Sequence, residues 1–172
     1  MNLTFVRKAT PFDAPKIYHV VVSAYTEVEK LLKPPTGLAA LKESSTDILR
    51  DMERMTVLVC TKNGEVIGSV RYSIMQIGDA KVAYISRLCV LPTEQRSGAG
   101  SQLLCEVEKQ CRAQKVDALA LHSPSKIEKY VYFYYRNGFY IQNTTKDRGY
   151  ARGLYLKDLT DKEYDLAPLL EL

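Results

Sequence analysis

The chain has 172 residues, 46% of them hydrophobic and 26% charged, which is the composition of a globular protein large enough to bury a core. Its net charge of +4 comes from 24 basic and 20 acidic residues that are mixed along the chain, so the charge gives no support for nucleic-acid binding. Neither an apolar run of about 18 residues nor a signal-peptide layout is seen. We therefore expect one domain over residues 1–172 that is cytoplasmic and contacts no membrane.

The first half of the chain predicts a first strand, two helices and then three successive antiparallel strands. The expected elements are a strand at 2–7, helices at 10–25 and 46–55, and strands at 56–61, 66–74 and 82–91. Thr10 is suited to cap the first helix, with Pro11 in its first turn. Asn63-Gly64 between two apolar runs is the strongest short signal for a β-hairpin. Residues 26–46 lack a regular pattern and are either a plain surface connection or a segment that overhangs a site.

The second half predicts a crossover followed by a closing hairpin. The expected elements are a helix that ends near 114, a strand at 117–122, a helix at 126–137, and strands at 139–142 and 150–156. A strand, a long helix and a strand in succession make the strands at 82–91 and 117–122 parallel neighbours. Gly138 suits the left-handed position that ends a helix. The fold class is therefore α/β (α+β), with a mixed, mostly antiparallel sheet of about seven strands and about four helices.

Residues 95–100, Gln-Arg-Ser-Gly-Ala-Gly, form a turn between a strand and a helix that is suited to hold a phosphate group. The first N–H groups of a helix lack intrahelical partners and lie at the positive end of its dipole. Gly98 and Gly100 let the backbone approach an anion closely, and Arg96 adds a fixed positive charge. The alternative is a helix start that only packs against a strand. The patterns of nucleotide-hydrolysing and dinucleotide-binding loops are absent.

Three further groups of residues have a structural interpretation when taken alone. The aromatic residues of 130–135 would anchor a helix to the sheet, although a catalytic tyrosine is the alternative. The four cysteines, at positions 60, 89, 105 and 111, lie in apolar runs or on helix faces and predict buried, reduced thiols and no metal site. His19 and His122 stand alone and predict packed or hydrogen-bonded histidines.

Two motifs resemble the GNAT superfamily of N-acetyltransferases. Leu88-Cys89-Val90, Pro92 and the turn from Gln95 to Gly100 are similar to its acyl-CoA-binding signature, Gln/Arg-x-x-Gly-x-Gly/Ala. Phe133-Tyr134 followed by Gly138-Phe139 is similar to its pattern Phe-Tyr-x-x-x-Gly-Phe. The resemblance covers nearly the whole chain in element order and implies the GNAT acyl-CoA N-acyltransferase fold.

The resemblance implies direct transfer of an acetyl group from acetyl-CoA, as co-substrate, to a primary amine of a small molecule or peptide. Tyr134 would protonate the leaving thiolate as general acid. The backbone at 88–90 would bind the pantetheine arm, and the N–H groups from Arg96 to Ser101 would bind the pyrophosphate. The implied CoA-binding residues are Leu88, Cys89, Val90, Gln95, Arg96, Ser97, Gly98, Ala99, Gly100 and Ser101. A homodimer is compatible with this assignment.

The sequence also departs from the family pattern and leaves alternatives open. Residues 84–87 lack the acidic residue that some members use as general base, so a water chain or a residue of 26–46 could serve instead. Four acidic residues in or beside that segment hint at a cationic amine, but interleaved lysines favour a solvated mixed-charge surface; they are Glu27, Glu29, Glu43 and Asp47. The rival functions are a non-catalytic acyl-CoA sensor or scaffold and a nucleotide-binding domain that uses the same turn.

Overall fold

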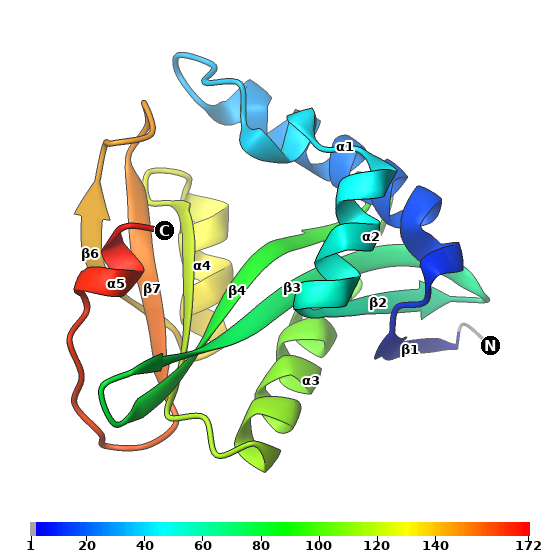
Figure 1. Ribbon diagram of the computed structural model, residues 1–172. Helices are drawn as coiled ribbons and strands as arrows, with labels where there is room; N and C mark the ends of the chain where they lie inside the picture. The colour runs from blue at the N-terminus through cyan, green and yellow to red at the C-terminus, as the bar shows by residue number, and fades with distance from the viewer. Residues whose placement is uncertain (1–2) are drawn as a thin grey trace. The chain divides into compact units, whose positions relative to one another are not determined.

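The computed structural model describes residues 3–172 and shows a mixed seven-stranded sheet in the order β1-β2-β3-β4-β5-β7-β6 (Figure 1). The helices are α1 (Ala14–Leu31), α2 (Ser45–Arg54), α3 (Ala99–Ala113), α4 (Glu128–Arg136) and α5 (Ala167–Leu170). The strands are β1 (Thr4–Lys8), β2 (Thr56–Lys62), β3 (Glu65–Ile77), β4 (Ala80–Val90), β5 (Ala118–Pro124), β6 (Tyr140–Thr145) and β7 (Arg152–Asp158). The predicted fold class is confirmed. The start of the first predicted strand, at residue 2, lies outside the described residues.

The described chain divides into two compact units. One contains the residues up to Ser73 together with Ser86–Val107, and the other contains Ile74–Ile85 with Glu108–Leu172. Strands β3 and β4 and helix α3 each run from one unit into the other. That the whole of 1–172 is one domain stays a prediction, and the units are described separately below.

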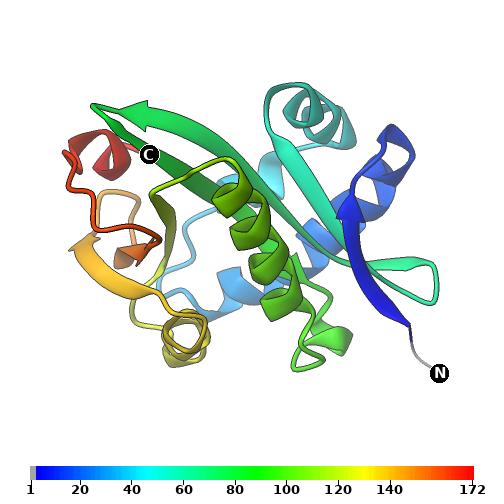
Figure 2. The same ribbon diagram turned by 90° about the horizontal axis from the view of Figure 1, so that it is seen from below.

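In the first unit, helices cover both faces of the strands (Figures 1 and 2). Side chains of a strand alternate between its two faces. Val57 and Val59 therefore lie on the same face of β2, where they pack in one buried cluster with residues of α1. That side of α1 is formed by Ile17, Val20, Val21 and Ala24, which recur at helical spacing. Cys60 lies on the opposite face of β2, where its Sγ is 4.0 Å from Oε1 of Gln102 in α3.

The β2–β3 hairpin forms as its sequence predicts. Asn63 and Gly64 both have left-handed backbones, with φ of 52° and 85°, which is the requirement of a two-residue type I′ turn. The two strands pair antiparallel from the turn outwards, starting at Lys62 opposite Glu65. Strand β3 continues to Ile77, three residues beyond the predicted end.

In the second unit, the predicted crossover and closing hairpin are both confirmed. Val82–Ile85 of β4 pair parallel with Ala118–Leu121 of β5. Strand β7 then pairs antiparallel with β5 on one side and with β6 on the other. Gly138 has a φ of +88° directly after α4, as expected for a residue that ends a helix.

Two expectations need correction, and one short helix is additional. Helix α1 extends to Leu31, six residues beyond Tyr25, and ends just ahead of Pro34. Helix α5 was not predicted, although its Leu169 is fully buried. Cys105 is exposed, whereas the other three thiols are buried, because residues on an amphipathic helix point to solvent as well as to the core. None of the helices within residues 3–172 is long and apolar enough to span a membrane.

Candidate functional site

The turn between β4 and α3 is an exposed loop that ends in the first turn of a helix. Residues 95–98 are exposed, and two of them have left-handed backbones: Arg96 with a φ of 69° and Gly98 with a φ of 89°. Gln102 N–H donates to the Gly98 carbonyl at 2.9 Å. The N–H groups of 99–101 therefore precede the intrahelical ladder and lie at the positive end of the helix dipole. This is the arrangement that stabilises a bound anion.

Contacts with the hairpin fix this turn in place. Nζ of Lys62 lies 2.8 and 3.1 Å from the carboxylate oxygens of Glu94, just ahead of the turn. Leu91 N–H donates to the Ile67 carbonyl at 2.8 Å. The next residue of β3, Gly68, allows the close approach, because a Cβ there would lie 3.1 Å from the Cys89 carbonyl oxygen. Gly68 was not identified from the sequence, although a glycine inside a strand pattern signals such an approach.

The predicted pantetheine-binding residues form the end of β4. Cys89 is buried, while Leu88 and Val90 are half-buried. The Leu88 carbonyl accepts a hydrogen bond from the Tyr25 hydroxyl of α1 at 3.5 Å. Burial raises the pKa of Cys89 to about 12, so its thiol is neutral and is not a nucleophile near neutral pH. Only backbone groups of this residue remain as candidate ligands for a substrate.

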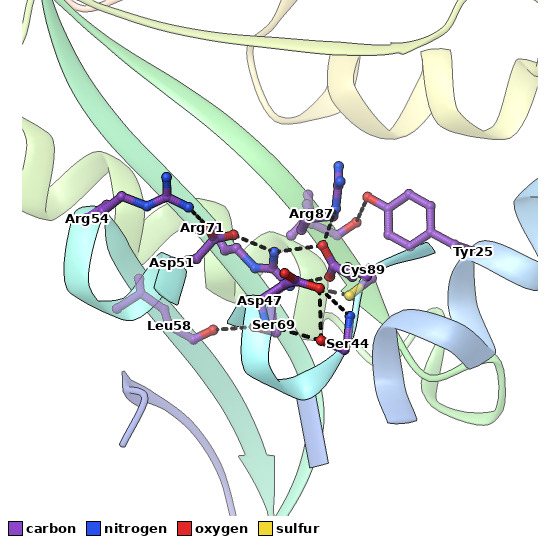
Figure 3. A network of polar contacts seen from close by, with 12 residues as sticks. Tyr25, Ser44, Asp47, Asp51, Arg54, Leu58, Ser69, Arg71, Arg87 and Cys89 are labelled. Atoms are coloured by element: carbon purple, nitrogen blue, oxygen red, sulfur yellow. Dashed lines mark hydrogen bonds and ion pairs between the residues drawn. The ribbon is translucent and has the colours of Figure 1, made fainter. Parts of the chain in front are cut away.

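A buried arginine connects β3 to helix α2 and to the segment before it (Figure 3). The Arg71 side chain is 1% exposed. Its Nη2 donates to Glu43 Oε1 at 2.6 Å, and its Nη1 donates to Asp51 Oδ2 at 2.8 Å. Burial lowers the pKa of Arg71, but hydrogen bonds and charges of the two carboxylates outweigh it, so the pKa is raised overall. Arg71 is therefore a fixed cation.

The same network reaches the residue just before Leu88. Glu43 Oε2 accepts from Nε of Arg87 at 3.2 Å, so one carboxylate bridges two arginines. Arg87 has a φ of 52° within β4, a backbone conformation that non-glycine residues rarely adopt and that persists only where the surroundings impose it. The sequence signal for this network is an arginine inside the apolar run of β3.

The acidic residues in and beside 26–46 have intramolecular partners. Glu27 pairs with Lys30 at 2.7 Å, and Glu29 accepts from the backbone of residues 37 and 38 at 2.6 and 3.1 Å. Asp47 accepts from Ser44 N–H at 2.7 Å in a helix cap. Glu43 serves the two arginines. These carboxylates therefore give no support for a cationic acceptor, and a general base from this segment stays a prediction.

Tyr134 lies in the aromatic core of the second unit. It is 8% exposed, and its ring centroid is 5.1 Å from those of Phe133 and Tyr155 and 5.9 Å from that of Phe139. Tyr135, the next residue of α4, is 72% exposed. Of the aromatic run, Tyr134 packs in the core as expected, whereas Tyr132 is 60% exposed and does not anchor the helix. The general-acid role of Tyr134 stays a prediction.

A tyrosine–histidine pair in the second unit was not predicted. The hydroxyl of Tyr84 in β4 lies 2.7 Å from Nδ1 of His122 in β5. Burial and the positive charge of Arg152 lower the pKa of His122 to about 4, so its imidazole is neutral near neutral pH. The parallel pairing of the two strands was predictable, but the register that brings these side chains together was not. Within residues 3–172, no cluster of three or more His, Cys, Asp or Glu side chains could hold a metal.

Comparison with known proteins gives one family and many similar folds. The model of the Acetyltransferase (GNAT) family matches residues 23–139. The PaiA N-acetyltransferase from Thermoplasma acidophilum, solved in complex with coenzyme A, is 19% identical with a TM-score of 0.78, and the match covers 91% of this chain and 99% of that one.

Two further solved structures have the same fold. A GNAT family acetyltransferase from Brucella melitensis in complex with acetyl-CoA is 22% identical, with a TM-score of 0.67 over 96% of this chain and 95% of that one. The ribosomal-protein-S18-alanine N-acetyltransferase from Escherichia coli is 18% identical, with a TM-score of 0.69 over 94% and 97% of the two chains. No curated protein matches the sequence significantly.

Proposed function

The chain belongs to the GNAT family of acetyltransferases, and from this premise we propose that it transfers an acetyl group from acetyl-CoA to a primary amine of a small molecule or peptide. The observation that carries this proposal is the turn at 95–98. It is exposed, its Gly98 is left-handed, and it leads into the first N–H groups of α3, which precede the intrahelical ladder. A pyrophosphate group matches such a site in charge and in hydrogen-bond acceptors.

The donor substrate is held mainly by backbone groups in this proposal. The N–H groups from Arg96 to Ser101 bind the pyrophosphate, and the Arg96 side chain adds a positive charge. The backbone of Leu88, Cys89 and Val90 binds the pantetheine arm. A bound acyl-CoA therefore depends on the left-handed turn more than on any one side chain.

The transfer itself makes one bond and breaks one. The amine nitrogen attacks the acetyl carbonyl carbon, the new C–N bond forms, and the C–S bond to coenzyme A breaks. Tyr134 donates its hydroxyl proton to the departing thiolate, a general-acid step. The attacking nitrogen loses a proton, which a water chain would carry to solvent.

A thiol-release assay with acetyl-CoA and a broad panel of amines tests this function. We expect free coenzyme A to appear only when an accepted amine is present, and the acetylated amine to appear in equal amount by mass spectrometry. Coenzyme A should also raise the melting temperature, whereas ATP should not. Tight binding of coenzyme A without turnover on any amine would indicate a non-catalytic acyl-CoA module instead, and protection by ATP alone would indicate a nucleotide-binding domain.

A further inference from the structure

Arg152 is a nearly buried cation in the second unit, at the start of β7. The backbone pairing places it opposite Pro124 of β5 and Thr145 of β6, so strands flank it on both sides (Figure 1). Its side chain is 8% exposed. Two of its nitrogens, Nε and Nη2, are fully buried atoms without a hydrogen-bond partner among residues 3–172. A buried charge without hydrogen bonds is costly, so this side chain needs a partner of opposite charge.

The two unpartnered nitrogens form one edge of the guanidinium group. In arginine the N–H bonds of Nε and Nη2 point in the same direction and match the two oxygens of a carboxylate. The edge that lacks partners is therefore the one that binds a carboxylate with two parallel hydrogen bonds.

Within residues 3–172, Asp147 forms an ion pair with Arg152. This pair neutralises the positive charge of Arg152 poorly. Its Oδ1 lies 3.4 Å from Nε, and the same oxygen already accepts from the Thr145 hydroxyl at 2.6 Å. Its Oδ2 lies 3.9 Å from Nε of Arg148. The Asp147 side chain is 49% exposed, so it can move away from the guanidinium at little cost.

His122 lies on the same face of the sheet as Arg152, because it pairs with Leu154, two residues along β7 from Arg152. Burial and the charge of Arg152 both disfavour protonation of His122, so its imidazole is neutral near neutral pH. A neutral imidazole bonded to the Tyr84 hydroxyl supplies no negative charge. Of the charges that act on His122, Arg152 and Arg148 are positive and Asp147 is negative, so displacement of Asp147 leaves a positive charge that favours an anion from outside the chain.

We propose that Arg152 binds a carboxylate of the acceptor through its Nε and Nη2 edge. This inference rests on the proposed function and names its substrate class: an amine that also bears a carboxylate, as an amino acid does. Asp147 competes for the same edge in the absence of substrate and is displaced by the incoming carboxylate.

Matched substrates test the inference on the wild-type protein. For several amino acids, the free acid, its carboxamide and the decarboxylated amine are compared as acceptors in the thiol-release assay. We expect kcat/KM for the acid to exceed that of the other two by at least about tenfold, because a site built for a hydrogen-bonding group is left unpaired by an analogue that lacks it. Equal use of the carboxamide or the amine would overturn the inference.

Two variants should act in opposite directions. Arg152→Gln should raise KM for the acid at least about tenfold and abolish the preference over the carboxamide. Asp147→Asn removes the competing charge and should lower KM for the acid. The matched control is Arg148→Gln, a neighbouring arginine that is 53% exposed, which should leave the preference unchanged. If the Arg152–Asp147 pair were only structural, Asp147→Asn would raise KM for the acid or leave it unchanged. That result would count against the inference.

A binding measurement separates this inference from the proposed function. The side-chain Nε–H signal of Arg152 is assigned by its loss in Arg152→Lys and followed by NMR during titration with each free amino acid and its carboxamide. Saturable shifts with a free amino acid, and none with its carboxamide, support the carboxylate site even if no amine is acetylated. No shift with any acid would overturn it even if amines are acetylated. Should Arg152→Gln fail to fold, the wild-type comparison, Asp147→Asn and this titration still decide.

Discussion

The hydroxyl oxygen of Tyr84 lies 2.7 Å from Nδ1 of His122, and the two residues belong to neighbouring parallel strands. Burial and the charge of Arg152 keep the pKa of this histidine far below the value of about 6.5 for a free imidazole. We predict that NMR titration will show His122 neutral down to about pH 4. Arg152→Gln should raise this pKa because it removes the larger of the two positive charges that lower it. An ordinary pKa in the wild-type protein would contradict the prediction.

This depressed pKa also fixes the sign of a stability change with pH. Because protonation is harder in the folded state, the unfolded chain binds more protons between its own pKa and that of the folded protein. The contribution of His122 is fully present above about pH 6.5 and is lost as the pH falls towards about 4. In His122→Gln, the free energy of unfolding should fall less steeply over this range than in the wild type.

Tyr134→Phe should reduce turnover strongly and leave affinity for coenzyme A nearly unchanged. A general acid typically contributes a factor of about 100 or more, so kcat should drop by that order. Tyr135→Phe is the matched control, because it removes the same hydroxyl from the next residue of α4, which is 72% exposed. The measurements are kcat in the thiol-release assay and Kd for coenzyme A by calorimetry. An unaltered kcat would remove the general-acid role.

Gly98→Ala should weaken coenzyme A binding, and Gly64→Ala should not. Both glycines have left-handed backbones, with φ of 89° and 85°, and a Cβ at either would meet no atom within 4 Å. The two variants therefore share a backbone strain of about 1–2 kcal/mol and should lose similar melting temperature. Only the first places a methyl group in the turn proposed for the pyrophosphate. Equal affinities for coenzyme A in the two variants would argue against that turn.

Glu43→Gln should destabilise the protein by about 2–4 kcal/mol, because it leaves the 1% exposed Arg71 with one carboxylate fewer. Glu27→Gln is the control, since Glu27 is 43% exposed and pairs with Lys30 on the surface, and it should cost less than about 1 kcal/mol. Chemical denaturation measures both. Similar small losses would mean that the arginine network contributes little.

Glu43 also forms an ion pair with Arg87, so we expect Glu43→Gln to affect the proposed binding site for coenzyme A as well. Release of the left-handed Arg87 would disturb the backbone that begins at Leu88, and affinity for coenzyme A should fall beyond the loss seen in Glu27→Gln. A large loss of stability with unchanged affinity would limit the network to a structural role.

The features that sequence alone predicted are those that neighbouring residues determine. The Asn63-Gly64 hairpin, the glycine that ends α4 and the crossover from β4 to β5 each follow from a short pattern of turn residues or apolar spacing. The turn at 95–100 was recognised for the same reason. What it binds, and whether Tyr134 acts with it, stays a prediction.

The features that sequence missed depend on residues far apart in the chain. Arg71 meets Glu43 across 28 positions, and Tyr84 meets His122 across 38. The register of the strands and the path of residues 32–44 decide these contacts, and neither has a local signal. Arg152 is the same case, because its burial is set by the strands on both sides. The acidic residues in and beside 26–46 gave only a hint of a cationic acceptor, and their intramolecular partners remove the support for it.

The exposure of Cys105 has a practical consequence for enzymology on this protein. Three of the four thiols are sealed in the core, so a chromogenic thiol reagent added to detect released coenzyme A would also titrate this one side chain on α3. Single-turnover experiments at stoichiometric enzyme would then count one thiol too many per molecule, unless Cys105 is first alkylated or replaced by serine. Oxidation in air would also link the exposed Cys105 residues of two chains by a disulfide bond. A dimer observed without reductant would then reflect this oxidation and not native assembly.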